Sequence, residues 1–283
     1  MKIPDRIQPL VDYGLVDEVI SRLMSGKEAD LYVVACGTEI LCAKVYKEAA
    51  KRNFKKAVQY TEGRKVRNSR RNRAMQKKSN FGRKEQEEIW QNAEVDALYQ
   101  LAAAGVRVPQ PSSCVDGVLL MELITDDEGC VAPRLDDVTM SQAGAIKFHS
   151  MVMQDVVRML CAGIVHGDLS EFNVLLDEHG PVIIDLPQAV NAAANNNAKA
   201  MLQRDVDNMK KYFSQFAPEL QNTHYAKEIW ELYEEGKLRP DTELTGNFEE
   251  SAEAADVDAV VAQIKAAYEE EQARLERLRE SQE

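Results

Sequence analysis

Short apolar runs separated by polar turn residues fill the start of the chain, a spacing typical of β-strands. Val16–Met24, Leu31–Val34 and Ile40–Tyr46 are such runs. Turn residues at 36–38 separate the second run from the third and predict a hairpin. Val118–Ile124 is another continuous apolar run, which predicts a buried strand. We therefore expect a small sheet in the first part of the chain.

Apolar residues spaced three and four apart predict helices over much of the remaining sequence. An early Pro and a following Gly delimit a short helix over Pro4–Tyr13. The longer predicted helices are Glu85–Ala104, Ser141–Ala162, Ala198–Phe216 and Tyr225–Glu235. The acidic tail from Ala254 repeats its apolar residues over fewer than four heptads, which favours docking on the body, or a weak partner helix, over a stable coiled coil.

Three polar residues stand at fixed offsets among apolar runs in the second half of the chain: Asp168, Asn173 and Asp185. The runs Val174–Leu176 and Val182–Ile184 flank a turn, so a hairpin would place Asn173 and Asp185 at the same end. Phosphoryl transfer requires oxygen ligands for Mg²⁺ and a carboxylate that orients and deprotonates a hydroxyl. This set of residues can supply both.

The spacing of these residues carries further information. His166-x-Asp168, an Asn five residues later and a hydrophobic strand ending in Asp185 form the catalytic and metal-binding pattern of kinases. The alternative is that Asp168 and Asn173 only cap turns, as Asp and Asn commonly do. All three residues at kinase spacing favour the catalytic interpretation.

A lysine in an apolar strand is the next candidate. Lys44 lies within Ile40–Tyr46, where an unpaired ammonium would be strongly disfavoured. Kinases place a Lys on such a strand to bind phosphates and to pair with a helix Glu, and Glu94 is the candidate partner. The alternative is an edge-strand Lys that extends to water.

Two other segments can contact a nucleotide. Ser25, Gly26 and Lys27 form a predicted turn where N–H groups, a hydroxyl and an ammonium can meet phosphate, although the turn is neither a Walker A loop nor the glycine-rich loop of protein kinases. The second segment is Val118–Ile124, which runs into a polar linker like a kinase hinge.

In such a hinge, backbone groups near Glu122 and Ile124 would bond adenine, and Met121 would line the back of the pocket. An ordinary core strand is the alternative interpretation, because side chains do not encode backbone recognition.

Charge is distributed unevenly along the chain. The net charge is −12, but Lys44–Lys84 holds 16 Lys and Arg against two acids. Tyr60–Arg83 lacks apolar periodicity and predicts a flexible basic loop, and the Tyr60–Lys84 stretch can contact RNA or be self-phosphorylated. Five scattered cysteines indicate reduced thiols, and the absence of a signal peptide or a long apolar run predicts a cytoplasmic protein without a membrane segment.

Four sequence motifs together resemble the RIO family of atypical serine/threonine protein kinases, over about residues 15 to 217. They are Ser25-Gly26-Lys27-Glu28-Ala29, Ala43-Lys44-Val45-Tyr46, His166-Gly167-Asp168-Leu169-Ser170-Glu171-Phe172-Asn173 and Ile184-Asp185-Leu186-Pro187-Gln188. The short N-terminal part resembles the form of the family without a winged helix domain.

The resemblance implies an α+β, two-lobed kinase-like fold with ATP and Mg²⁺, or Mn²⁺, between the lobes. The implied parts are a small antiparallel β N-lobe plus helix at 1–121, a mainly α C-lobe at 122–245 and a helical C-terminal tail at 246–283. Asp168 would be the catalytic carboxylate, Asn173 and Asp185 the metal ligands, and Lys44 the ATP lysine. The position of Asp185 is also associated in this family with an aspartyl-phosphate intermediate.

Departures from ordinary protein kinases predict a different regulation. Asp185-Leu186-Pro187 replaces Asp-Phe-Gly, no Ala-Pro-Glu follows, and no Ser, Thr or Tyr occurs between Pro187 and Lys211. We therefore expect activity without activation-loop phosphorylation.

Three functions compete at this point. The leading one is a RIO-type serine/threonine kinase, which can act mainly as an ATPase through attack by Asp185. The second is a small-molecule phosphotransferase of the aminoglycoside or choline kinase type, which the Ser-Gly-Lys-Glu-Ala motif and Gln188 disfavour. The third is a non-catalytic RNA-associated scaffold that uses ATP only as a conformational ligand. In this and the leading interpretation, Tyr60–Lys84 can contact RNA or a ribosomal particle.

Overall fold

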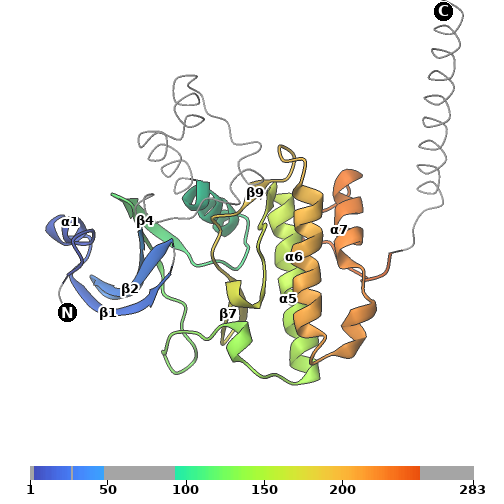
Figure 1. The fold of residues 1–283 in the computed structure, drawn as a ribbon, viewed down its shortest axis with the longest axis horizontal. Coiled ribbons are helices and arrows are strands. Elements are labelled where there is room, and N and C mark those ends of the chain that lie inside the picture. The colour runs from blue at the N-terminus through green and yellow to red at the C-terminus, as the bar shows by residue number, and fades with distance from the viewer. Residues whose placement is uncertain (1–2, 27, 48–92, 249–283) are drawn as a thin grey trace, which may run out of the picture. The chain divides into compact units, whose positions relative to one another are not determined.

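A computed structural model describes residues 3–26, 28–47 and 93–248 (Figure 1). Lys27, the predicted basic loop 60–83, the start of the helix expected at Glu85 and the tail from residue 249 lie outside the described residues. The chain divides into a unit Met1–Gly246 and a unit Asn247–Glu283. All of the elements below belong to the first unit.

The N-terminal sheet has five strands in the order β1-β2-β3-β5-β4, and every neighbouring pair is antiparallel. Its strands are β1 (Glu18–Ser25), β2 (Ala29–Cys36), β3 (Glu39–Tyr46), β4 (Pro111–Val115) and β5 (Val118–Glu122). The predicted hairpin between β2 and β3 is confirmed, with Cys36 opposite Glu39. β4 was not predicted, because Pro and Ser favour strands weakly, and it forms an edge of the sheet, where Pro is tolerated.

The two faces of the sheet pack against different helices. Val34, Val45 and Leu120 lie in one buried cluster with Ile7 and Leu10, the latter from α1 (Gln8–Asp12). On the opposite face, Tyr46 and Leu119 belong to the main core, together with Leu98 and Leu101 of the helix over 93–103. Because successive side chains of a strand alternate between faces, Lys44 lies on the face of this second helix.

The second part of the unit is mainly helical. Its three long helices are α5 (Gln142–Cys161), α6 (Ala198–Phe213) and α7 (Tyr225–Glu234), which run side by side in Figure 1. Its short strands are β6 (Ile164–Val165), β7 (Val174–Asp177), β8 (Gly180–Ile183) and β9 (Val190–Asn191), and its 3₁₀ segments are η2 (Leu135–Asp137), η3 (Glu171–Asn173) and η4 (Pro218–Asn222). Ser141 caps α5, and its side chain accepts a hydrogen bond from the Gly144 N–H at 3.1 Å.

The end of α6 and one of the short strand pairs differ from expectation. α6 ends at Phe213 and not at Phe216, because Phe216 and Ala217 turn back to the Phe213 carbonyl shortly before Pro218, which cannot continue a helix. The pairs β7–β8 and β6–β9 are both antiparallel, and only the first was predicted. Two-residue strands such as β6 and β9 carry too little periodicity to be recognised in a sequence.

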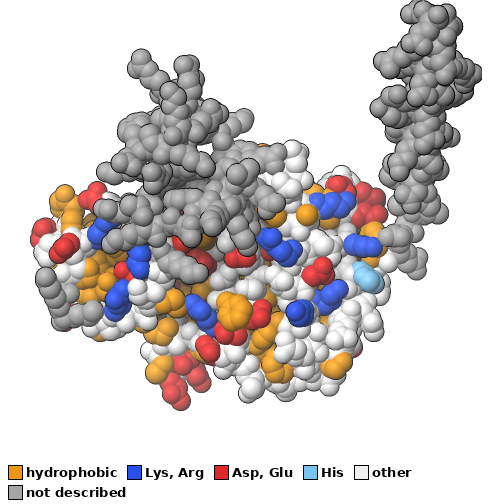
Figure 2. Space-filling model, in the orientation of Figure 1, with side chains coloured by type: hydrophobic (Ala, Val, Ile, Leu, Met, Phe, Trp, Pro, Cys, Tyr) orange, Lys and Arg blue, Asp and Glu red, His pale blue; other side chains and the backbone are white. Residues whose placement is uncertain are grey.

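Three further features complete the description. No helix among the described residues is long and apolar enough to span a bilayer. All five cysteines are free thiols. On the face shown in Figure 2, basic and acidic side chains are interspersed over the described residues.

Candidate active site

Lys44 is the centre of the buried charge cluster between the sheet and the second, helical part. Its Nζ lies 2.5 Å from Glu94 Oε1 and 3.1 Å from Asp185 Oδ1. Lys44 and Glu94 are buried, whereas the Asp185 side chain is 49% exposed. The pair of Lys44 and Glu94 has the geometry that the sequence suggested, and Asp185 joins it through a contact with Lys44 that was not predicted.

The charges in this cluster stabilise one another. Burial alone would lower the pKa of Lys44, but the neighbouring carboxylates of Glu94 and Asp185 raise it well above its ordinary value. Burial would likewise raise the pKa of Asp185, yet the charge and hydrogen bond of Lys44 bring it below the ordinary range. Both groups are therefore ionised at neutral pH.

Asp185 is the second residue after β8, and Ile184 lies between them. The Ile184 N–H donates to the Asn173 carbonyl at 3.0 Å, which extends the β7–β8 pairing by one position and brings Asn173 and Asp185 to the same end of the hairpin. The Asp185 backbone has a φ of 66°, in the left-handed region that Asp and Asn tolerate better than most residues. This conformation turns the chain out of the strand just where Asp185 meets Lys44.

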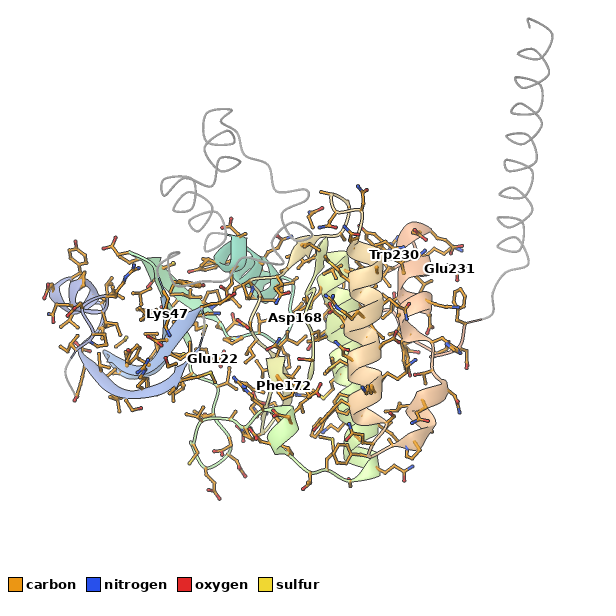
Figure 3. All side chains as sticks on the ribbon, in the orientation of Figure 1. Lys47, Glu122, Asp168, Phe172, Trp230 and Glu231 are labelled. Carbon is orange, nitrogen blue, oxygen red and sulfur yellow. The ribbon has the colours of Figure 1, made fainter. Side chains whose placement is uncertain are left out.

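Asp168 lies on the loop between β6 and η3, and Figure 3 places it between the sheet and the long helices. It is exposed, whereas its neighbours Gly167 and Leu169 are buried. The Asn173 Nδ2 donates to the Asp168 carbonyl at 2.9 Å, and the Gln188 Nε2 donates to the Asp168 Oδ2 at 2.8 Å. Asp168 thus presents a carboxylate to solvent from a constrained backbone.

His166 joins this loop to the residue that follows β8. Its Nδ1 lies 3.3 Å from the Asp168 N–H, and its Nε2 lies 3.1 Å from the Ile184 carbonyl. One ring nitrogen thus meets the backbone of Asp168 and the other meets the backbone of Ile184. The buried imidazole therefore ties the segment of Asp168 to the segment of Asp185.

Sequence reasoning missed the residues of α6 that hold the loop. The buried Asp205 accepts hydrogen bonds from the Gly167 N–H at 2.7 Å and from the Leu169 N–H at 3.0 Å. Arg204 donates to the Gly167 carbonyl, and Asn208 donates to the Leu169 carbonyl at 2.9 Å. Burial raises the pKa of Asp205 to about 6, partly opposed by the charge of His166.

A signal for Asp205 was present in the helical pattern. It lies four residues after Met201 and four before Met209, both of which are buried, and this places its carboxylate on the buried face of α6. A carboxylate on an apolar face needs hydrogen-bond donors, and the loop of Asp168 supplies them through the Gly167 and Leu169 N–H groups.

The predicted phosphate turn lies at the tip of β1 and β2. The Gly26 N–H donates to the Ala29 carbonyl at 2.9 Å, and a Cβ on Gly26 would approach that oxygen to 3.2 Å. Lys47, which sequence reasoning also missed, contacts the Ser25 Oγ at 3.1 Å and the Gly26 carbonyl at 2.6 Å. Lys47 therefore fixes the shape of the turn from the end of β3.

The predicted hinge residues continue from β5. The Glu122 N–H donates to the Gln110 carbonyl at 2.8 Å, and the Ile124 carbonyl accepts from the Ala132 N–H at 3.0 Å. Met121 is partly buried against the main core. Among the described residues, no hydrogen bond engages the Ile124 N–H, which leaves this donor for a ligand.

The oxygen atoms of Asn173 and Asp185 are suitable ligands for a hard cation. Within the described residues, no three His, Cys, Asp or Glu side chains gather as a metal cluster. The Asn173 amide nitrogen is bound to the Asp168 carbonyl, so its oxygen is left for a cation beside the half-exposed Asp185. One amide and one carboxylate fit Mg²⁺, which commonly completes its coordination with phosphates and water.

Comparison with known proteins agrees with this arrangement. The family model of the RIO domain matches residues 30–226. The chain is 31% identical over 212 residues to the RIO-type serine/threonine-protein kinase Rio1 of Haloferax volcanii, covering 73% of this chain and 67% of the relative. It is 31% identical over 202 residues to the serine/threonine-protein kinase RIO1 of Homo sapiens, covering 71% and 34%.

A third relative, the RIO-type serine/threonine-protein kinase Rio2 of Methanocaldococcus jannaschii, is 36% identical over 113 residues, or 39% of this chain and 40% of the relative. The chain thus spans about two thirds of the Haloferax relative and about a third of the human one. Both the predicted family and the predicted α+β kinase-like fold are confirmed. The chain belongs to the RIO family of serine/threonine kinases.

Proposed function

We propose that this chain uses ATP and Mg²⁺ to phosphorylate serine or threonine hydroxyls, with ATP hydrolysis as the competing reaction. The observation that carries the proposal is the contact of Lys44 with both Glu94 and Asp185, beside the constrained loop of Asp168 and Asn173. Phosphoryl transfer depends mainly on such positioning and charge stabilisation.

The residues divide the work between them. Lys44, held as a cation by Glu94, would contact the nucleotide phosphates. Asp168 would orient the acceptor hydroxyl and take its proton as the oxygen attacks the γ-phosphorus and ADP leaves. Asn173 and Asp185 would hold Mg²⁺, with Mn²⁺ as a second candidate, and the metal supplies charge neutralisation at the phosphates.

The rest of the nucleotide would lie between the turn and the hinge. Ser25, Gly26 and Lys27 are proposed to contact phosphate. The backbone near Glu122 and Ile124 is proposed to bind adenine beside Met121. The donor at the Ile124 N–H and the turn geometry at Gly26 support these assignments.

The division into lobes at 1–121 and 122–245 and a tail at 246–283 is part of the same proposal. Autophosphorylation, contact with RNA or a ribosomal particle through Tyr60–Lys84, and a cytoplasmic location also remain predictions. They rest on the charge and composition of the chain.

The test is a reaction of the full chain with γ-labelled ATP and Mg²⁺, with products separated into free phosphate, acid-stable label and hydroxylamine-labile label. Asp168→Asn should lower acid-stable label on Ser or Thr by about a hundredfold or more, as expected for loss of general-base catalysis. Asp185→Asn should abolish all products. Asp207→Asn, on the exposed side of α6, is the matched control.

Full turnover in Asp168→Asn would refute the assigned role. A hydroxylamine-labile label that disappears in Asp185→Asn would identify an acyl phosphate on Asp185 and favour the ATPase interpretation. Absence of label and phosphate in the wild type would leave only a binding function.

A further inference from the structure

Gln188 is a residue near the reaction centre to which the proposed function gives no role. Its Nε2 donates to the Asp168 Oδ2 at 2.8 Å. Among the described residues, no cation contacts the Asp168 carboxylate, so its hydrogen-bond partner there is a neutral amide. A neutral donor orients a carboxylate without neutralising its charge.

The backbone fixes Gln188 in place. It lies in a turn closed by the Ala189 N–H and the Leu186 carbonyl at 3.0 Å. Leu186 is buried, and directly after the turn Val190 pairs with Val165 of β6, the strand that leads into the loop of Asp168. The turn before Val190 and the β6–β9 pairing after it therefore hold the Gln188 backbone close to the loop of Asp168.

The hydrogen bond also fixes which atoms remain available. An ionised carboxylate only accepts, so the Gln188 nitrogen faces Asp168 and its oxygen Oε1 is left as an acceptor. With Oδ2 engaged, Oδ1 of Asp168 is the second acceptor. One charge-assisted hydrogen bond joins the Gln188 amide to the Asp168 carboxylate, so the two free acceptors, Gln188 Oε1 and Asp168 Oδ1, are held next to each other.

Two adjacent acceptors distinguish between nucleophiles. A water molecule has two O–H donors and can satisfy both Asp168 and Gln188, whereas a serine or threonine hydroxyl has one. We infer that Gln188 orients a water molecule together with Asp168 and so sets the share of ATP that is hydrolysed instead of transferred. A Gln that orients attacking water is a known device in phosphoryl transfer.

The step balances as an in-line displacement, and it rests on the proposed function. The water oxygen forms a bond to the γ-phosphorus, and the bond from that phosphorus to the β,γ-bridging oxygen breaks with its electron pair on ADP. One water proton passes to Asp168 and then to solvent. The other stays on the released phosphate.

The test compares wild type with Gln188→Met, a near-isosteric change that removes both the donor and the acceptor. Rates of free phosphate release and of acid-stable label, on the chain or on added dephosphorylated casein, are measured in the same reaction. Gln203→Met is the matched control, because Gln203 Nε2 also donates to an Asp, Asp207, at 2.9 Å, and neither of these two residues contacts Asp168 among the described residues. Thermal midpoints verify that each variant folds.

We expect phosphate release to fall about tenfold or more in Gln188→Met, and transfer to fall less, so that the ratio of label to free phosphate rises at least threefold. A loss of global structure would change both rates equally and would not change this ratio. Equal losses of both products, or unchanged phosphate release, would overturn the inference while leaving the proposed function intact. A wild type that forms neither product would defeat the proposed function itself, and the role of Gln188 with it.

Discussion

At the scale of single residues, Lys44 keeps its charge in a buried place because two carboxylates surround it. Only one of them, Asp185, is proposed to bind metal. Under the proposed function, Glu94 would hold the Lys44 ammonium toward the nucleotide phosphates and keep it from neutralising Asp185.

Glu94→Gln should lower ATP turnover by about 10- to 100-fold, because Lys44 would shift its charge toward Asp185 and compete with the cation there. Steady-state turnover and nucleotide affinity of the full chain measure the effect. Glu234→Gln is the matched control, since its pair with Lys199 is exposed at 3.4 Å. Equal turnover in wild type and Glu94→Gln would contradict the role given to this pair.

At the scale of elements, side chains of α6 hold the loop of Asp168 in place by hydrogen bonds to its backbone. Asp205 offers two oxygens to two backbone N–H groups on either side of Asp168. These bonds explain how an exposed carboxylate can be held in one orientation on a loop.

Asp205→Asn should reduce turnover by about 10- to 100-fold, because an amide has one acceptor and leaves either the Gly167 or the Leu169 N–H unsatisfied, at about 1–3 kcal/mol. Asp207→Asn, on the same helix, should change turnover little. The comparison is made on full-length protein with folding followed by circular dichroism. A folded Asp205→Asn protein with wild-type turnover would show that the loop keeps its geometry without α6.

The same scale shows what the sequence could predict. β-branched and aliphatic runs predicted β7 and β8, and the spacing of Asp168, Asn173 and Asp185 predicted that these residues lie near one another, while their roles stay predictions. Asp205, and the contact of Gln188 with Asp168, were missed because the partners are groups brought close by tertiary packing, which local periodicity does not encode. The edge strand β4 was missed for a different reason, since its Pro and Ser residues have weak strand preference.

At the scale of the whole molecule, two buried titratable groups give opposite pH dependences of stability. His149 is buried between Phe213 and Tyr225, and its Nε2 has no hydrogen-bond partner. Burial, and to a smaller extent the charge of Lys210, lower the pKa of His149 to about 4. Its stabilising contribution is therefore present above the unfolded pKa of 6.5 and is lost as the pH falls toward 4.

Asp205 acts in the opposite direction. Its pKa is raised from 3.8 to about 6, so the folded state binds its proton more tightly than the unfolded chain. The stability it contributes is present below pH 3.8 and is lost as the pH rises through 6. The wild type should thus show a shallow net slope between pH 4 and 6 from these two groups.

His149→Phe isolates the first effect, because an aromatic ring fills the site without a titrating nitrogen. The free energy of unfolding of this variant, minus that of wild type, should be about 2 kcal/mol higher at pH 5 than at pH 7.5, because only wild type loses stability as the histidine becomes protonated. Urea titrations at both pH values measure the difference. His179→Phe, at a 74% exposed side chain, should show little pH dependence of this kind, and the same result for His149→Phe would refute the argument.

The left-handed backbone at Asp185 also limits how this position can change during evolution. Asn and Gly can adopt that conformation at little cost, whereas a β-branched residue would add strain of about 1–3 kcal/mol. The mutational route to a descendant that has lost its chemistry but kept its architecture therefore leads through Asn or Gly. A related protein that became inactive in this way would lack the Asp185 carboxylate and would keep the β7–β8 hairpin unchanged.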